Sequence, residues 1–592
     1  MNKAKLKILS LATILSSIVF SLLCVSFHFD VSLIAFPVCL LFVAVIYFKG
    51  FSKVFLNNQL SSIKTLRILL QYHPYVLLIA FVLRRSGSFS TPFALDLITV
   101  FFWCSTSVLD LIVLHYINPK RIGKIDSAWK NSLEKNSISS QKGIKRVFLE
   151  IASWVDAIVQ AVFMVLLLNI FIVQLYQIPS ESMVPEFLIG DRVVVFKTSS
   201  GPKFPLSEVG FPYLKNYKRG DIVVFRNPHY TENKDEVSKR KYEVKTFLSQ
   251  LVYMCSLTTV NLNVDEDGNQ IADPLVKRIT GVPGEQLMMQ DGILYSRTKE
   301  NLNWQKVEDD SKYAEWNLNQ VKPSVKKQIQ DFPLTNIEYE TMLECEEERR
   351  NFDISLFKIQ ASSITNNFYD LFNFPYKKDD TINLTEFFNQ KNLFEYAIFS
   401  NHIFIAQKLL SNKNGFDWFK NFMLDWTSSI PETFDGNLYE ESNYKLNLMC
   451  KKLVGLLILQ DCKLLLNGKT ETEISNDSTI ISLLKEAQKL NDYIFLLDRR
   501  NMSAFPENDK NGNPQFIPEN SYFMMGDNRF NSLDMRHSYD NWLAPLTKLD
   551  PVSVTYYSDI SPQYVNRSKI LGTTSYRFWP LNRRGVPGHT GK

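Results

Sequence analysis

Cysteine is scarce in this sequence, and the short motifs of several large enzyme classes are missing. Only 7 cysteines occur among 592 residues, and none of them forms a CxxC pair. This spacing excludes the common zinc-binding and disulfide-rich frameworks. The absence of HExxH and GxSxG motifs also argues against zinc peptidases and α/β-hydrolases. We therefore expect no metal site and no cofactor.

Charge is also limited. Charged residues make up 21% of the chain, the net charge is +5, and residues 1–176 contain 17 basic but only 7 acidic side chains. Proteins that bind nucleic acids concentrate basic charge on one folded face. Here the excess of basic residues falls among long apolar runs instead, so we expect no nucleic-acid partner.

Those apolar runs predict a membrane region. About 20 apolar residues span the ~30 Å core of a bilayer. The first run ends without the small residues of a signal-peptide cleavage site, so we interpret it as an uncleaved anchor. The third run is the weakest, because His73 and Pro74 interrupt it. The expected spans are residues 8–28, 31–48, 68–84, 93–117 and 157–176.

The distribution of basic residues predicts how these spans are oriented. Five spans with a cytoplasmic N-terminus leave 15 Lys and Arg residues in the inside segments, eight of them in 120–146, and only Arg84 and Arg85 outside. Cytoplasmic loops carry such an excess of basic residues. We therefore predict a multi-pass protein of the inner (plasma) membrane, whose body after Tyr176 lies on the extracytoplasmic side.

The body shows two patterns. Short runs rich in Val, Ile and Phe between Gly and Pro predict strands in 177–299 and 514–592, with a smaller, partly helical insertion at 229–274. Leucines at helical spacing predict a mainly helical insertion at 300–513, in which the charged run Glu344–Arg350 is interpreted as a solvated helix face. The fold class is thus a helical membrane anchor plus a mostly-β domain with a helical insertion. The clearest predicted strands are Arg192–Phe196, Asp221–Phe225 and Tyr522–Met525.

Two serines stand where the chain leaves the last predicted span, in Pro179-Ser180-Glu181-Ser182-Met183-Val184-Pro185. The segment is compatible with a simple linker or with a nucleophile, which requires a base nearby. Lys277 lies in an apolar run that enters a Gly/Pro turn and can serve as that base if burial lowers its pKa, although a surface lysine on an edge strand is by itself the more common case. His537 is the one histidine beside a polar cluster, and we interpret it as a loop residue.

That cluster is Gly526-Asp527-Asn528-Arg529-Phe530-Asn531-Ser532-Leu533-Asp534-Met535-Arg536. It is either a surface loop or a buried floor beneath a site. In order, the PS-x-SM-x-P, RGDIVVF, KRITGVPG and GDNR-x-NS-x-D-x-R segments resemble the type I signal peptidases. The resemblance covers about 177–228, 274–298 and 515–581. Lysine at 277 is typical of the bacterial type, whereas Phe530 and Met535 depart from its usual pattern.

The resemblance implies a role for each candidate residue. Ser182 is the nucleophile, Lys277 the general base, and the Ser180 hydroxyl an oxyanion donor. Ser532 orients the Lys277 amine, Asp534 and Arg536 form an ion pair behind it, and Asp527 and Arg529 support the loop. The side chains implied to line shallow pockets for small substrate residues are Ile178, Pro179 and Met183.

The function implied by the resemblance is that of a membrane-bound serine endopeptidase. It removes N-terminal signal peptides from exported preproteins and uses no cofactor. The implied partners are those signal peptides, which carry small residues at −1 and −3, the lipid bilayer and the translocation machinery. A regulated membrane peptidase with one dedicated client and a catalytically silent membrane scaffold are the alternatives, and the intact Ser182/Lys277 pair argues against the scaffold.

Overall fold

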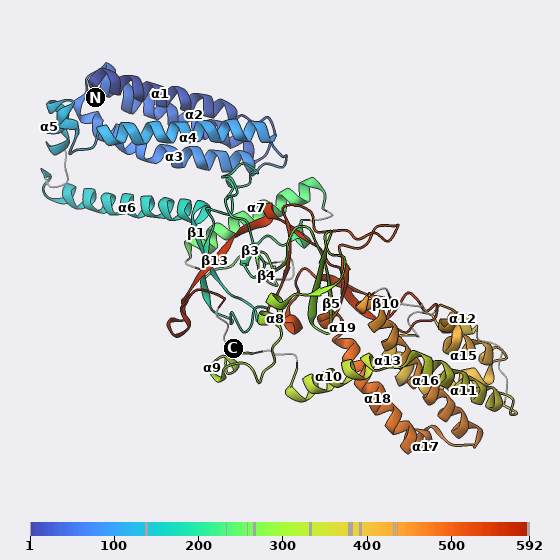
Figure 1. Ribbon diagram of the computed structural model, residues 1–592. Helices are drawn as coiled ribbons and strands as arrows, with labels where there is room; N and C mark the ends of the chain where they lie inside the picture. The colour runs from blue at the N-terminus through green and yellow to red at the C-terminus, as the bar shows by residue number, and fades with distance from the viewer. Residues whose placement is uncertain are drawn as a thin grey trace.

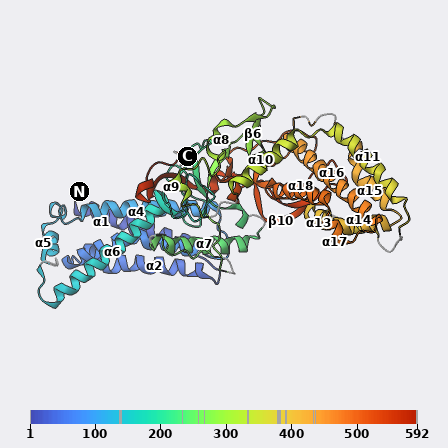
Figure 2. The same cartoon turned by 90° about the horizontal axis from the view of Figure 1, so that it is seen from below.

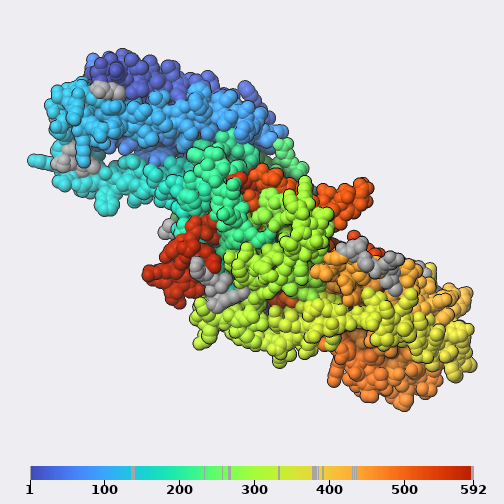
Figure 3. All heavy atoms as spheres, viewed as in Figure 1, coloured from blue at the N-terminus to red at the C-terminus, as the bar shows by residue number. Residues whose placement is uncertain are grey.

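The computed structural model describes residues 2–588, apart from 136–139, 232–233, 257, 265–267, 331–333, 377–382, 390–392, 430, 432–433 and 435. Three parts follow one another in space (Figure 1): a bundle of N-terminal helices, a sheet-rich body, and a helical lobe. Figure 2 shows the same order from below. In the space-filling view of Figure 3 the bundle and the lobe lie at opposite ends of an elongated molecule.

Five N-terminal helices are long and apolar enough to cross a membrane. This confirms the helical anchor of the predicted fold class. The third helix is continuous through Pro74. The helices are α1 (Lys3–Leu23), α2 (Ala35–Val45) continued by η2 (Ile46–Leu56), α3 (Ile63–Arg85), α4 (Phe93–Tyr116) and α6 (Ile144–Phe171), with the short α5 (Ser127–Lys135) before α6.

The helix that carries most of the last predicted span, 157–176, begins and ends earlier in the chain than that span. The helix α6 begins at Ile144 and passes through Asp156, whose carboxylate accepts hydrogen bonds from the Tyr72 hydroxyl and, at 2.9 Å, from the Gln160 amide. These bonds pair the carboxylate, so the helix can continue through Asp156. At the other end the chain leaves the helix at Phe171 and forms strand β1, which pairs with β2.

The bundle is joined to the body by a polar and apolar contact, which we call the bundle–body joint. Arg84 at the end of α3 binds Asp96 in α4 at 2.5 Å, and the Ser207 hydroxyl of the body donates to the same carboxylate at 2.7 Å. Phe204 and Val209 of the body pack into the core of the bundle. The joint and the α6 connection therefore attach the body to the N-terminal helices at two places.

The main sheet of the body is antiparallel, with the strand order β1-β2-β13-β3-β4-β9-β12. The predicted strands appear within a residue of their expected bounds, because runs of β-branched and aromatic residues pack well on a pleated surface. The strands are β1 (Val173–Gln177), β2 (Arg192–Phe196), β3 (Ile222–Phe225), β4 (Leu275–Gly281), β9 (Ser521–Met525), β12 (Val565–Asn566) and β13 (Ile570–Trp579).

A second sheet and a hairpin extend the body toward the lobe. The second sheet has the order β7-β6-β5-β8. Its last strand falls inside the stretch expected to be mainly helical, because residues 502–505 pair with β5. The strands are β5 (Glu285–Gln290), β6 (Ile293–Thr298), β7 (Gln305–Lys306) and β8 (Met502–Phe505), and the hairpin is β10 (His537–Pro545) with β11 (Thr555–Ile560).

The lobe is helical, as expected, and shares its core with the hairpin. Val554 and Tyr556 of the body lie in the same apolar core as Tyr444 of the lobe. The described helices of the insertion with at least six residues are α8 (Glu308–Ala314), α10 (Asn336–Arg350), α11 (Ile354–Phe372), α13 (Glu395–Ser400), α14 (His402–Ser411), α15 (Gly415–Leu424), α16 (Leu438–Leu466) and α18 (Ser478–Phe495).

The interpretation of Glu344–Arg350 as a solvated helix face is wrong for part of the run. Glu346 and Arg349 are each only 1% exposed. Arg500 binds Glu346 at 2.9 Å, and Arg349 binds Asp291 in the β5–β6 turn. The helix α10 therefore buries one charged stripe against the body, because partners from other segments compensate those charges.

Candidate active site

Ser182 and Lys277 meet in the body although 95 residues separate them in the chain. Ser182 lies in the loop between β1 and β2, and Lys277 lies on the inner strand β4. The Lys277 Nζ and Ser182 Oγ atoms are 2.6 Å apart, and both side chains are buried. Burial lowers the pKa of Lys277 to about 8, against the opposing effect of Asp534 and Asp527. A neutral amine at this distance can accept the serine proton.

The loop at residues 526–536 is a buried floor beneath this pair. The Asn528 backbone N–H donates to the Ser182 carbonyl at 3.1 Å, and its side-chain amide donates to the Glu181 carbonyl at 3.2 Å. Gly526 is sterically required, since an added Cβ would collide with the Ser532 side chain and the Ser182 carbonyl. The floor therefore holds the backbone of residues 178–191, which carry the candidate nucleophile Ser182 and which we call the nucleophile loop.

Asp534 is the centre of the floor. Arg536 binds its carboxylate at 2.8 Å, and the Gly526 backbone N–H donates to it at 2.9 Å. Burial by itself raises the pKa of Asp534, but Arg536 and these hydrogen bonds bring it well below its usual range. The Ser532 hydroxyl donates to Asp534 at 2.8 Å, so its described hydrogen bond is to this carboxylate rather than to the Lys277 amine.

Asp527 and Arg529 each bind a residue that the sequence did not single out. Arg278, next to Lys277, binds Asp527 through two bonds of 2.8 and 2.6 Å. Arg529 donates to Asp310 at 2.6 Å. Successive strand residues point to opposite faces. The position of Arg278 directly after Lys277 could therefore have predicted a charged contact on the far face of β4. Asp310 lies in the insertion, where no motif marked it.

Trp316 was also missed, and it ties the insertion to the active site. Its indole N–H donates to the Asp527 carbonyl at 3.0 Å. Trp316 and Val325 pack with Val184 and Leu188 of the nucleophile loop in one small apolar core. The first part of the insertion therefore packs against the nucleophile loop and the floor.

Ser180 and His537 occupy different positions relative to the pair. The Ser180 hydroxyl donates to Ser182 Oγ at 3.3 Å. His537 begins strand β10, so its interpretation as a loop residue is wrong. Its Nδ1 lies 2.8 Å from Asp559. Burial and the nearby Arg536 lower the pKa of His537 to about 4, and its described hydrogen bond is to β11 rather than to Ser182.

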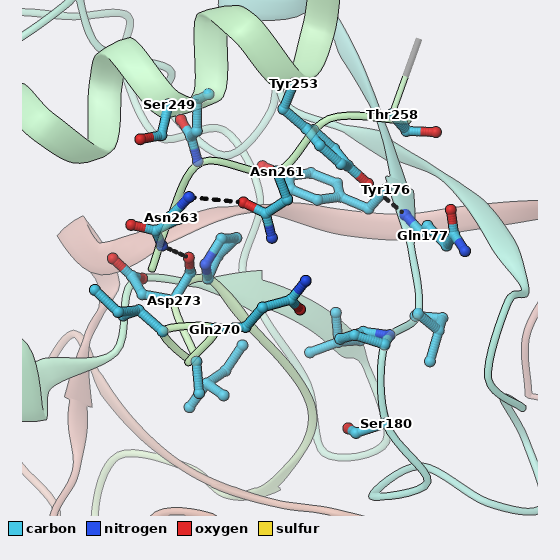
Figure 4. A pocket seen from close by; sticks show the side chains of 18 of the residues that line it. Tyr176, Gln177, Ser180, Ser249, Tyr253, Thr258, Asn261, Asn263, Gln270 and Asp273 are labelled. Atoms are coloured by element: carbon cyan, nitrogen blue, oxygen red, sulfur yellow. Dashed lines mark hydrogen bonds between the residues drawn. The ribbon is translucent and has the colours of Figure 1, made fainter. Parts of the chain in front are cut away.

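The pair opens into a cleft of about 520 Å³. Ile178, Pro179 and Met183 line it together with Ser180, Ser182 and Lys277. Figure 4 shows Ser180 at one side of this cleft and the helix α7 (Glu236–Cys255) at the other. Among the described residues, no group of three or more His, Cys, Asp or Glu side chains is arranged to hold a metal ion.

Comparison with known proteins identifies the family. The sequence profile of the family described as "Signal peptidase, peptidase S26" matches residues 151–351 and 459–579, together more than half of the chain. This match leaves out most of the bundle and much of the helical lobe. The chain belongs to the signal peptidase S26 family, which confirms the resemblance found in the sequence.

Several relatives carry the name signal peptidase I. That of Buchnera aphidicola subsp. Baizongia pistaciae is 36% identical over 105 residues, 18% of this chain and 32% of the relative. That of Pseudomonas fluorescens is 31% identical over 121 residues, which are 20% of this chain and 42% of the relative. That of Helicobacter pylori strain 26695 is 38% identical over 116 residues, which are 17% of this chain and 38% of the relative. The chain thus spans less than half the length of these relatives, and no solved structure matches.

Proposed function

We propose that this protein is a membrane-bound serine endopeptidase that removes N-terminal signal peptides from exported preproteins, with Ser182 as nucleophile and Lys277 as general base. The observation that carries the proposal is the buried 2.6 Å contact between Ser182 Oγ and Lys277 Nζ. Membership of the signal peptidase family supports the substrate class, and the apolar cleft walls suit small side chains at −1 and −3.

The proposed reaction has two halves. Ser182 Oγ attacks the scissile carbonyl as its proton passes to Lys277 Nζ. The Ser182 backbone N–H and the Ser180 hydroxyl stabilise the oxyanion, with each such donor contributing roughly 3 kcal/mol. Lys277 then gives its proton to the leaving amine, and an acyl-enzyme remains. In the second half Lys277 activates a water molecule, which releases the signal peptide and regenerates Ser182. The steps use only side chains of this protein.

The pH profile tests the proposal on purified protein in lipid vesicles. The base must be neutral, and burial lowers the pKa of Lys277 to about 8. Below that pH the protonated fraction of the amine rises, so we expect cleavage to fall about tenfold for each unit of pH, and to reach a plateau above pH 8. Cleavage rates of a fluorescent preprotein measured from pH 5 to 10 check this.

The choice of substrates in that assay separates the general from the dedicated enzyme. A panel of exported preproteins with small residues at −1 and −3 should be cleaved broadly. Cleavage of a single member would favour the peptidase with one dedicated client. Rates that do not change between pH 6 and 9 would contradict the lysine base, and a folded protein that cleaves none of the panel would contradict the peptidase.

The position of the basic loops supports an extracytoplasmic catalytic body. Lys3 contacts Asn58 and Asp126, so the N-terminus, the loop before α3 and the segment before α5 meet at one end of the bundle. The bundle–body joint lies at the other end (Figure 1). The basic loops of the predicted cytoplasmic side are thus separated from the body by the length of the apolar helices.

Reporter fusions test this topology. We expect a reporter inserted at Gly143 to score as cytoplasmic, because residues 120–146 carry eight basic side chains. A reporter fused after the last residue should score as extracytoplasmic. Alkaline phosphatase and a fluorescent protein that folds only in the cytoplasm give opposite readouts. Two fusions that score on the same side would contradict the five-span arrangement.

A further inference from the structure

The cleft continues beyond the apolar side chains near Ser182 into a polar end. This end is formed by Tyr176 on β1 and by Gln250 and Asn263, which come from the insertion at 229–274. Figure 4 shows the helix α7 above it, with Tyr253 and Asn263 on the far side from Ser180. The insertion therefore adds a wall that the nucleophile loop and β4 do not provide.

Three polar atoms in this wall are unpaired. Among the residues that the structure describes, the Tyr176 hydroxyl, Gln250 Nε2 and Asn263 Oδ1 have no hydrogen-bond partner. Tyr176 is 7% and Asn263 6% exposed. Leaving a buried polar group without a partner is energetically unfavourable. These atoms are therefore poised to bind a group that supplies both a donor and an acceptor.

The other ends of the same side chains and the roof are fixed. Gln250 Oε1 accepts a hydrogen bond from Arg226 at 3.0 Å, and Asn263 Nδ2 donates to the Asp273 carbonyl at 2.7 Å. The Tyr253 hydroxyl accepts from the Gln177 backbone N–H at 3.1 Å and so ties α7 to β1. The unpaired atoms are thus held in place before any ligand binds.

The local charges are already paired. The carboxylate of Asp273 lines the same cleft, but Arg226 lies 3.4 Å from it, and the Tyr242 hydroxyl donates to it at 2.8 Å. A charged ligand would meet no free opposite charge among these described groups. An uncharged hydroxyl or amide group matches the unpaired atoms best.

We propose that this polar end is a substrate subsite for an uncharged hydroxyl or amide side chain of the peptide, an inference that rests on the proposed peptidase function. Strand β1 is an edge of the main sheet, and beyond Gln177, whose N–H is bound by the Tyr253 hydroxyl, an extended peptide can lie alongside the segment that leads to Ser182. Tyr176 and Ile178 are two residues apart and both buried, so they share a face. The polar subsite therefore lies about two peptide residues from the position that Ile178 serves.

Tyr176→Phe tests the subsite, because it removes only the unpaired hydroxyl. The substrates are fluorogenic peptides in which each position from −6 to +2 carries Ser, Gln or Leu in turn. We expect the wild-type protein to prefer Ser or Gln over Leu at one position other than −1 and −3. Tyr176→Phe should weaken that preference about fivefold, as expected for one lost hydrogen bond, measured as the ratio of kcat/KM for the polar peptide to kcat/KM for the Leu peptide.

Two further variants sharpen the result. Tyr217→Phe is the matched control, since Tyr217 is equally buried but packs against Tyr522 outside the cleft, and it should keep the wild-type preference. Gln250→Glu keeps the atom that binds Arg226 but replaces the unpaired donor by an acceptor. This variant should shift the preference toward a basic side chain at the same position.

The outcomes separate the subsite from the proposed function. If the wild-type protein cleaves the peptides without any polar preference, or if Tyr176→Phe retains the preference as fully as Tyr217→Phe, the subsite is wrong and the peptidase stands. If the folded wild-type protein cleaves neither these peptides nor any preprotein, the proposed function fails and the subsite fails with it.

Discussion

Replacing Lys277 with Met should abolish cleavage while leaving the protein folded and inserted in the membrane. Methionine keeps an apolar stem of similar length and removes the amine that lies 2.6 Å from Ser182 Oγ. Ser182→Ala removes the nucleophile. In the proposed mechanism the two groups act in one proton transfer, so each single variant should lose activity as completely as the double variant, by on the order of 10⁴-fold or more. Single-turnover cleavage of a preprotein in vesicles measures this.

Lys277→Arg separates loss of the base from loss of positive charge. A guanidinium remains protonated and cannot accept the serine proton, so this variant should also be inactive. Lys312→Met is a matched control, because Lys312 is an exposed lysine in α8 and its replacement should leave the rate unchanged. Retained cleavage in Lys277→Met would rule out the serine–lysine mechanism, whatever the substrates of the protein are.

Asp527→Asn should destabilise the body strongly, although the side chain keeps its shape. Asp527 and Arg278 are each about 2% exposed and joined by two hydrogen bonds. Removing one charge leaves the buried guanidinium with the more distant Glu186, 3.9 Å away, as its carboxylate partner, at a cost of about 3 kcal/mol in the free energy of unfolding. The loss should also loosen the nucleophile loop, because the neighbouring Asn528 binds the Ser182 carbonyl. Thermal denaturation measures the loss of stability, and limited proteolysis measures the loosening of the nucleophile loop.

A double variant tests the physical reason for that loss. Arg278→Met together with Asp527→Leu removes both charges, so much of the stability lost in Asp527→Asn should return. Asp309→Asn is the control, since the Asp309–Lys312 pair is about two-thirds exposed and solvent screens it. An Asp527→Asn protein as stable as Asp309→Asn would show that the ion pair does not hold the floor of the site.

The sequence predicted the parts of this fold that depend on local patterns. Runs such as Arg192–Phe196 carry the period and the β-branched residues of a strand, and the first four apolar segments carry the length of a span. The pairing of Ser182 with Lys277 could be anticipated from motif order. The floor could be expected only as one of two interpretations, because a cluster of Asp and Arg residues looks the same on a surface and in an interior.

What could not be predicted depends on contacts between distant segments. The buried stripe of α10 needs Asp291 and Arg500 as partners, and neither is adjacent in the chain. The support that Trp316 gives to the nucleophile loop depends on packing against Val184. The polar end of the cleft is visible only once α7 lies over β1. Each of these is a contact between distant segments. The spacing of hydrophobic residues and the runs of charge along the sequence do not predict such contacts.

The bundle–body joint has a mechanical consequence. A catalytic body connected to the membrane helices through α6 alone could rotate about that single connection. Ser207 on Asp96, with Phe204 packed among the bundle helices, adds a second point of attachment and removes that rotation. The mouth of the cleft is then presented at one height and one angle above the apolar helices. A body separated from the bundle would lose this alignment. It would also expose an apolar patch at Phe204 and Val209, and such a patch favours self-association in water.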